Sequence, residues 1–244
     1  MKRLLVVILI IGLSVSASAK SPGTVAAQFL KLSGSAAGSA RAGCNIAAAD
    51  IPDTFQINPA AASQLSGFNL ALMYADWLGS LSLFNFAGSY SAKSFGTIFV
   101  TSEVLTTGKI DNVVLTSEGV LAPDSGTVSA WDMNFNLGYA RNFTAGDNNF
   151  GIGLSLHSIV SSDEDSYSAF AVDVGGYAKV LRQRMELGLS VRNLGTPLDK
   201  SSLPIAASFG AQYRITPFKD FDILPALQFD YYLDDSNLKT RKIS

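Results

Sequence analysis

The stretch FGIGLSLHS at residues 150–158 alternates large apolar side chains with small or polar ones. The apolar set is Phe150, Ile152, Leu154 and Leu156, and the set between them is Gly151, Gly153, Ser155 and His157. Successive side chains of a β-strand point to opposite faces of the sheet. This period of two therefore predicts a strand with one apolar face and one polar face.

Runs with the same period begin at Phe68 and recur as far as Leu233. They predict ten strands, with another beginning near Lys239. The expected strands are 68–78, 80–91, 94–102, 110–116, 129–141, 149–160, 167–180, 184–194, 204–214 and 221–233. Most of them have about ten residues or more, whereas strands in globular proteins commonly have about five or six.

The length of these strands and the chemistry of their two faces indicate the fold class. Tilted strands of about 9–11 residues with apolar-out and polar-in alternation are typical of membrane barrels. Aromatic residues near strand ends match the interfacial girdles of such barrels. They are Tyr74, Trp77, Tyr90, Trp131, Tyr139, Phe143, Tyr167, Tyr177, Tyr213, Tyr231 and Tyr232. The sequence thus predicts an all-β fold, a transmembrane antiparallel outer-membrane β-barrel over residues 68–244.

The connections between the expected strands are of two kinds. Gly79 and residues 144–148 are short turns, whereas residues 109–129 and 195–203 are longer and polar. In outer-membrane barrels, short turns face the periplasm and long loops face outward. This alternation favours the same class.

The first residues carry an export signal. Lys2 and Arg3 precede an apolar run from Leu4 to Leu13, and Ala17-Ser18-Ala19 has the small-x-small form of a cleavage site. This pattern predicts a signal peptide over residues 1–19. The apolar run is shorter than the roughly 20 residues that span a bilayer as a helix. We therefore expect export, and with the strands a bacterial outer-membrane location.

The composition excludes some classes of partner. Removing Lys2 and Arg3 leaves 16 basic against 20 acidic side chains, without a basic cluster, so nucleic-acid binding is not expected. Charged residues make up 16% of the chain, against roughly 25% in ordinary soluble domains. Mean hydropathy is +0.24, yet no helix-length apolar run follows the signal peptide. The apolar character lies instead in the alternating strands.

Residues 20–67 precede the expected wall and are rich in small side chains. The run SGSAAGSARAGCNIAAAD at 33–50 is too small in composition to form a core of its own, but it permits close backbone packing inside another structure. Asn58-Pro59 marks a turn, because proline fixes its own φ and disfavours the helical region for the residue before it. We expect this segment in the lumen of the barrel.

Several stretches, in order along the chain, resemble the PorV/PorQ outer-membrane proteins of the FadL-like superfamily of long-chain fatty-acid transporters. Near the N-terminus they are GTVAAQFLKL at 23–32, Arg41-Ala42-Gly43, AAAD at 47–50 and INPAAAS at 57–63. Later they are FAVDVGGYAKV at 170–180, MELGLSVRNLG at 185–195 and LPIAASFGAQYRI at 203–215. The resemblance covers nearly the whole mature chain.

The resemblance implies a fourteen-stranded barrel with residues 20–67 folded inward as a hatch. The residues it points to as a hatch or ligand gate are Phe29, Arg41, Asn58, Pro59 and Ala60. About ten to eleven strands are expected here, and NLKTRKIS at 237–244 has the form of a turn and the start of another strand. We therefore expect a truncated or frameshifted member of a longer family, with an incomplete wall or one that closes with about ten strands.

Polar residues on the alternate face are candidates for lining the lumen. They are His157, Asp173, Glu186, Arg192 and Arg214, and the last four can form a ladder of charge pairs or simply be solvated. His157 is the only histidine and Cys44 the only cysteine, so a metal site or a catalytic triad has few possible members. Asp163-Glu164-Asp165 and Asp234-Asp235 lack the regular ligand spacing of a calcium loop. No catalytic residue, metal or cofactor is expected.

Three functions remain open from the sequence. The first is uptake of hydrophobic solutes such as long-chain fatty acids, with outer-membrane lipid around the barrel. The second is a PorV-like scaffold that binds exported proteins. The third is a soluble secreted β-sandwich adhesin. An enzyme has the least support.

Overall fold

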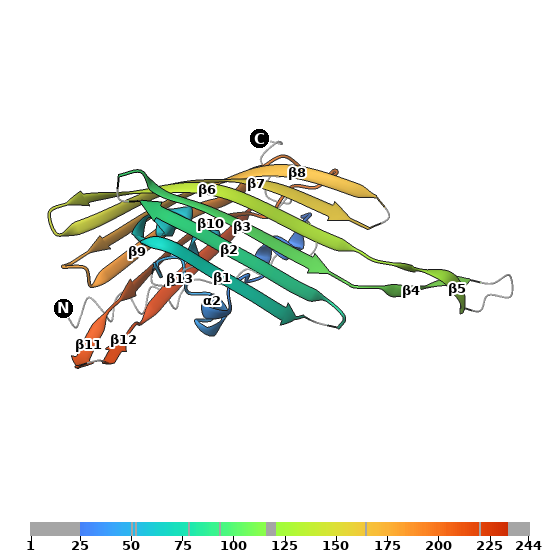
Figure 1. The fold of residues 1–244 in the computed structure, drawn as a ribbon, viewed down its shortest axis with the longest axis horizontal. Coiled ribbons are helices and arrows are strands. Elements are labelled where there is room, and N and C mark those ends of the chain that lie inside the picture. The colour runs from blue at the N-terminus through green and yellow to red at the C-terminus, as the bar shows by residue number, and fades with distance from the viewer. Residues whose placement is uncertain are drawn as a thin grey trace, which may run out of the picture.

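The computed structural model describes residues 25–233 except 50, 52, 78, 93, 116–120, 164 and 220. The expected signal peptide, Asp234-Asp235 and the expected strand near Lys239 lie outside these residues. Figure 1 shows one large curved sheet, with the short helices of the described segment before β1 (Gly67–Asp76), coloured blue to teal, against one side of it.

The large sheet contains nine antiparallel strands in the order β1-β2-β3-β6-β7-β8-β9-β10-β13. Neighbours in the sheet are neighbours along the chain, apart from two inserted hairpins. The strands are β1 (Gly67–Asp76), β2 (Ser82–Ala92), β3 (Gly96–Thr106), β6 (Trp131–Ala145), β7 (Asn148–Ser162), β8 (Ser166–Val180), β9 (Met185–Gly195), β10 (Ile205–Tyr213) and β13 (Ala226–Leu233). The prediction of an all-β fold with long antiparallel strands is thus confirmed.

Within the described residues the sheet is open, so of the two expectations a wall closed by about ten strands is not present there. Among the described strands, β1 pairs only with β2, and β13 pairs only with β10. The prediction of ten wall strands was also wrong in two places. Residues 110–116 lie in β4 (Ile110–Leu115), which pairs with β5 (Leu121–Val128) in a separate hairpin, and 221–233 divides between β12 (Phe221–Ile223) and β13. β12 pairs with β11 (Ile215–Phe218) in a second small hairpin.

The two faces of the large sheet are opposite in chemistry. Along β7, Ile152, Leu154 and Leu156 are 57%, 48% and 57% exposed, whereas Ser155 and His157 are buried. The same holds on β6, where exposed Phe135 and Leu137 flank buried Asn136. The side chains predicted to share the apolar face do share it, and that face is the exposed one.

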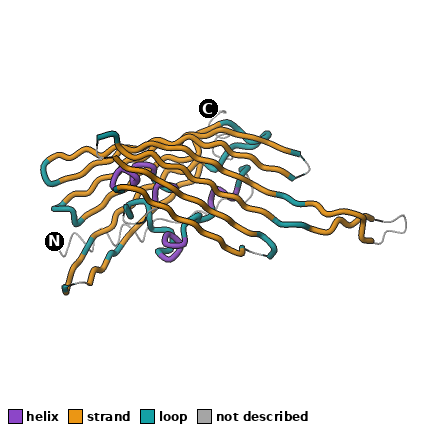
Figure 2. Tube along the Cα trace, viewed as in Figure 1, coloured by secondary structure: helices purple, strands orange, loops and turns teal. Residues whose placement is uncertain are grey.

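The N-terminal segment, residues 25–66, covers the polar face. It forms η1 (Gln28–Lys31), α2 (Ala36–Ala40), η2 (Thr54–Gln56) and η3 (Pro59–Gln64), which Figure 2 shows as short helices joined by loops. Gln56 exchanges side-chain hydrogen bonds with Asn85 of β2, and Gln228 of β13 accepts from the backbone N–H of Ile46. Strands near opposite edges of the sheet both reach this short segment, so the sheet curves around it. We call the covered side the inner face.

Glycines on the inner face let the backbone of the N-terminal segment lie directly on the strands. A Cβ placed at Gly153 would lie 2.3 Å from the carbonyl carbon of Pro59, and one at Gly188 would lie 2.3 Å from the carbonyl oxygen of Ile46. Neither glycine has a positive φ, so close approach and not backbone conformation requires them. Small residues in the segment and glycines in the wall therefore fit each other.

The antiparallel order assigns each connection to one end of the sheet. The β4–β5 hairpin and the loop at 196–204 lie at one end, and the tight turn between β6 and β7 lies at the other. The turn around Gly79, between β1 and β2, lies at the end with the long connections, unlike the sequence expectation of short turns opposite long loops. Figure 1 shows the β4–β5 hairpin projecting well beyond the sheet.

Candidate functional site

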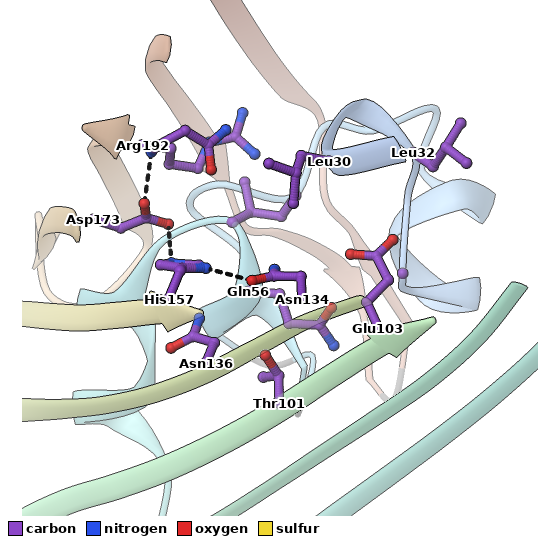
Figure 3. A pocket seen from close by; sticks show the side chains of 13 residues that line it. Leu30, Leu32, Gln56, Thr101, Glu103, Asn134, Asn136, His157, Asp173 and Arg192 are labelled. Carbon is purple, nitrogen blue, oxygen red and sulfur yellow. Dashed lines mark hydrogen bonds and ion pairs between the residues drawn. The ribbon is translucent and has the colours of Figure 1, made fainter. Parts of the chain in front are cut away.

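His157 is the centre of a polar cluster on the inner face. Its Nε2 lies 3.0 Å from Oδ2 of Asp173 on β8, and its Nδ1 lies 3.0 Å from Oδ1 of Asn134 on β6. Figure 3 shows both contacts beside a cavity. Ser155 and Asp173 are opposite each other in the β7–β8 register, so His157 and Asp173 meet on a diagonal. The two sequence candidates are thus brought together.

Ser155 completes the residue set of a catalytic triad but not its geometry. Its Oγ lies 3.4 Å from Nε2 of His157, the same nitrogen that faces Asp173. In a triad, the serine and the carboxylate occupy different ring nitrogens, because the histidine takes a proton on one side while it is held on the other. The cluster therefore cannot activate Ser155 in this arrangement.

A β-bulge on β9 adds two consecutive polar side chains to the inner face. The β8–β9 register shifts between Val172 and Val174, and both Arg192 and Asn193 are buried. Asn193 has a φ of 60°, a region that asparagine tolerates better than most residues. Its backbone N–H donates to Oδ1 of Asp173 at 2.7 Å. Bulges commonly redirect side chains at functional sites, and this one holds Asp173 in place.

Arg192 connects β9 to the edge of the sheet. Its Nη2 lies 3.6 Å from Oδ1 of Asp230 on β13 and 3.3 Å from Oγ of Ser208 on β10. Ser208 also donates to Asp230. Asp230 and Asn193 were not among the sequence candidates, and the interruption of the period of two at Arg192-Asn193 was the available signal for the latter.

A second polar network ties the N-terminal segment to the wall. Nη1 of Arg41 donates to Oε1 of Gln212 at 3.1 Å, and Nε2 of Gln212 donates to Oε2 of Glu186 at 2.6 Å. Lys179 pairs with the other oxygen of Glu186 at 3.0 Å. Arg41 and Glu186, both sequence candidates, are therefore linked through Gln212.

Arg214 lies apart from the other candidates. It follows the last residue of β10 and pairs with Asp222 at 2.8 Å, with both side chains about one-third exposed. The proposed ladder among Asp173, Glu186, Arg192 and Arg214 does not form. Each of the four has a different partner in the structure, because the strand register sets their spacing along the sheet.

Asn58 fixes the turn that the sequence marks as Asn-Pro. Its Oδ1 accepts from the N–H of Ala60 at 3.1 Å and caps η3, and its Nδ2 donates to the carbonyl oxygens of Ile46 at 3.0 Å and Gly176 at 3.1 Å. Asn58, Pro59 and Ala60 are buried against β7 and β8. One side chain therefore joins two parts of the N-terminal segment to the wall.

Phe29 packs in an apolar cluster at the end of the sheet that carries the long connections. It is 3% exposed and packs in one cluster with Ile159 of β7, Ala169 of β8 and Leu198 of the loop between β9 and β10. This cluster anchors η1. A second cluster, in which Phe55 lies 4.8 Å from Phe99 between ring centroids, anchors η2.

A cavity of about 40 Å³ lies between the N-terminal segment and the polar cluster. Leu30, Gln56 and Ile57 line it from the segment, and residues of β3 and β6–β9 line it from the wall. Ligand pockets usually have about 300–1,000 Å³. This cavity has room for an ion or a few water molecules.

Asp53 is a buried acid of the N-terminal segment itself. Burial raises the pKa of its carboxyl above the usual 3.8, while the hydroxyl of Ser35, which donates to Oδ1 at 2.8 Å, opposes part of the rise. Ser35 also caps α2 by accepting from the N–H of Gly38 at 2.9 Å. The pair joins two turns of the segment.

The described residues contain no group of three or more His, Cys, Asp or Glu side chains placed to hold a metal. Among the described helices, none has the length and apolar character to cross a membrane. Comparison with protein-family models, curated proteins and solved structures finds no match.

Proposed function

We propose that the protein is a FadL-like outer-membrane β-barrel protein that takes up hydrophobic solutes, and that the outer face of its large sheet contacts lipid. One observation carries the membrane assignment: the outer face exposes large apolar side chains, while the inner face is polar and covered. A soluble monomer rarely exposes a continuous apolar patch of more than a few hundred Å². Here the exposed apolar side chains extend from β1 to β13.

Strand length supports the same proposal. β6, β7 and β8 have 15 residues each, and at about 3.3 Å per residue each strand is roughly 50 Å long. A strand tilted by about 40° would cover the roughly 25 Å apolar band of an outer-membrane barrel with residues to spare. Exposed aromatic residues near both strand ends fit the interfacial regions. They are Tyr74, Trp77, Trp131 and Tyr167 at one end and Tyr90, Phe95 and Tyr213 at the other.

Detergent dependence tests the membrane assignment. We expect the mature protein to fold only with micelles or vesicles and to migrate faster on unheated than on heated gels. A mature protein that stays folded and dissolved in aqueous buffer alone would contradict the proposal and favour the β-sandwich adhesin. The single nine-stranded sheet gives that alternative no support.

Uptake of a hydrophobic solute requires the N-terminal segment to move. The described cavity of about 40 Å³ is far too small for a fatty acid. The resemblance to FadL-like proteins and the segment inside the curved sheet motivate the proposal. Labelled oleate should therefore bind saturably to refolded protein, and Asn58→Ala or Pro59→Ala should weaken binding. Asp147→Ala, in the exposed turn between β6 and β7, is the control.

The tight fixing of the N-terminal segment favours a second candidate, a PorV-like scaffold that binds exported proteins. Asn58, Arg41 and Gln56 all bond to the wall, and glycines allow backbone contact. A fixed segment suits a binding module, which has no need of a moving hatch. Crosslinking in cells discriminates the two: recovery of exported proteins that share a C-terminal domain, without oleate binding, would favour the scaffold.

A further inference from the structure

Glu103 of β3 is a buried acid beneath the N-terminal segment. It is 8% exposed and lines the inner cavity, and its Oε1 has no hydrogen-bond partner among the described residues. Leu30 and Leu32 of the segment line the same cavity, and Figure 3 shows them on the side toward which the Glu103 carboxyl points. A charged carboxylate without a partner is costly in such a place. The carboxyl is therefore neutral while the segment covers it.

The groups of this cavity that can carry a positive charge already have acidic partners. Nε2 of His157 lies 3.0 Å from Oδ2 of Asp173, and Nη2 of Arg192 lies 3.6 Å from Oδ1 of Asp230. Figure 3 places Arg192 on the far side of the cavity from Glu103. Ionisation of Glu103 would therefore add a negative charge that no described cation balances.

Two further charged groups lie on the elements around Glu103. Lys31 of η1 is exposed, and its Nζ lies 5.2 Å from the ring centroid of Tyr232 on β13. Asp132 of β6 lies two positions before Asn134, so the two side chains share the inner face. Asn134 is directly opposite Glu103 in the β3–β6 register. Asp132 is thus a like charge close to Glu103, and it adds to the cost of ionising that carboxyl.

The strand register places Glu103 beside the amide pair that ties the N-terminal segment to β2. Asn85 is directly opposite Glu103 in the β2–β3 register, and both are buried on the inner face. Asn85 and Gln56 exchange two side-chain hydrogen bonds, of 2.8 Å and 2.9 Å. Directly opposite residues have Cβ atoms about 4.5–5.5 Å apart. An ionised carboxylate has about four acceptor sites, so it would compete for these amides even if Asn134 supplied one donor.

We propose that Glu103 is a proton-controlled latch for the N-terminal segment. While the carboxyl is protonated, Leu30 and Leu32 cover it without burying a charge, and the Gln56–Asn85 pair stays intact. When the proton leaves to bulk water, the carboxylate attracts the amide N–H groups of that pair, because hydrogen bonds to a charged acceptor are the stronger ones. It also needs water, which the two leucines exclude. Rising pH therefore favours release of the segment from β2 and β3.

This latch goes beyond the proposed function, because it concerns how the segment is released, whichever solute or protein binds. The proton is bound more tightly with the segment in place than with the segment released. The stabilisation of the seated segment is therefore fully present at low pH and is lost once Glu103 ionises. Buried glutamic acids are known to stay neutral up to about pH 8–9. The range from about pH 7 to about pH 9.5 is accordingly the one to measure.

Labelling of a buried thiol in the segment measures its release. Cys44→Ser removes the native thiol, and Thr54→Cys places a thiol in η2, where Thr54 is 1% exposed. The labelling rate of the full mature protein in detergent is divided, at each pH, by the rate for the urea-unfolded chain, which removes the effect of thiol ionisation. One-proton linkage changes an equilibrium by up to about tenfold per pH unit. We expect the normalised rate to rise about tenfold over this range, and to stay flat when Glu103→Gln is added.

Asp53→Asn is the matched control, because it removes a different buried acid of the same segment and should keep the full rise. A flat normalised rate with Glu103 present would overturn the proposal, and so would an equal rise with Glu103→Gln. The urea midpoint gives a second measurement, which should fall over the same range only when Glu103 is present. A midpoint that falls while the labelling rate stays flat would also overturn the latch, because Glu103 would then ionise with the segment in place. These outcomes leave the membrane and uptake proposals to their own tests.

Discussion

Asn58 makes three side-chain hydrogen bonds that join the N-terminal segment to itself and to β8. Replacing it with alanine removes the cap of η3 and leaves the carbonyl oxygens of Ile46 and Gly176 without their shared donor. We expect the free energy of unfolding to fall by about 1–3 kcal/mol. Urea unfolding in detergent measures this loss.

Asn58→Asp separates the two roles of this side chain. It keeps an oxygen that can cap η3 but loses the Nδ2 donor to Ile46 and Gly176. If capping alone mattered, the aspartate variant would be as stable as the wild type. We expect it instead to be clearly destabilised, because both carbonyl oxygens lose their donor and a charge becomes buried.

Asp53 makes stability depend on pH in a direction set by its raised pKa. The native state binds the proton of the Asp53 carboxyl more tightly than the unfolded state does. The stability that Asp53 contributes is therefore greatest below pH 3.8, the usual pKa, and is lost as the pH rises through the higher pKa of the folded state. Asp53→Asn keeps an acceptor for Ser35 and cannot ionise. Compared with the wild type, it should lose less stability between about pH 4 and pH 7.

Urea midpoints across this range check the prediction for Asp53. Asp147→Asn, at an exposed turn, is the control and should follow the wild-type curve. An Asp53→Asn curve parallel to that of the wild type would show that the carboxyl titrates alike in both states.

At the scale of elements, β8 contains adjacent glycines with opposite surroundings. A Cβ at Gly175 would lie 2.1 Å from Oδ1 of Asn58, whereas one at Gly176 would meet nothing within 4 Å. Gly175→Ala should therefore lower the free energy of unfolding by about 1–3 kcal/mol through overpacking. Gly176→Ala should change it by no more than about 0.5 kcal/mol. The same urea experiment compares both, and equal losses would argue against the close approach of Asn58 to Gly175.

The sequence was a sufficient guide to strands whose alternation is long and regular. In β7 and β8, every second residue is apolar over many positions, and those side chains share one face as expected. The β4–β5 hairpin was misassigned because residues 110–116 have the composition of a wall strand, while their pairing depends on Leu121–Val128. Local pattern predicts a strand, but only tertiary pairing decides which sheet it joins.

The candidate site was predictable residue by residue but not as contacts. Alternation correctly indicated that His157, Asp173, Glu186 and Arg192 share the inner face. Their partners depend on the strand register and on the bulge at Asn193. Alternation of apolar and polar residues predicts neither of these. Arg214 continues the even-numbered inner positions of β10, yet the strand ends at Tyr213 and the side chain turns toward Asp222.

At the scale of the whole molecule, the direction of the edge strands limits how the wall can be completed. β1 and β13 run the same way, because nine antiparallel strands separate into five of one direction and four of the other. Pairing β1 with β13 directly would be parallel. An edge inside a bilayer would leave backbone groups without partners, so an all-antiparallel wall in lipid needs an odd number of further strands. Walls of ten or fourteen strands both meet this condition.

The outer face offers the sharpest test of where the molecule resides. Leu154 lies near the middle of β7 and is 48% exposed. In water, replacing so exposed a leucine with arginine changes stability by about 0.5 kcal/mol or less. At the middle of a bilayer, an arginine on the lipid face of a barrel costs about 2–4 kcal/mol. We therefore expect Leu154→Arg to lose that larger amount in urea unfolding from lipid vesicles.

Leu181→Arg is the matched control for the lipid-facing substitution. Leu181 is 60% exposed in the turn between β8 and β9, beyond the strands, so the same chemical change there should cost little. Both variants replace an exposed leucine with arginine. The difference between their losses of unfolding free energy therefore reports whether lipid or water surrounds β7. Equal and small losses would mean that water, not hydrocarbon, covers the apolar face, and the membrane proposal would then fail while the fold remained as described.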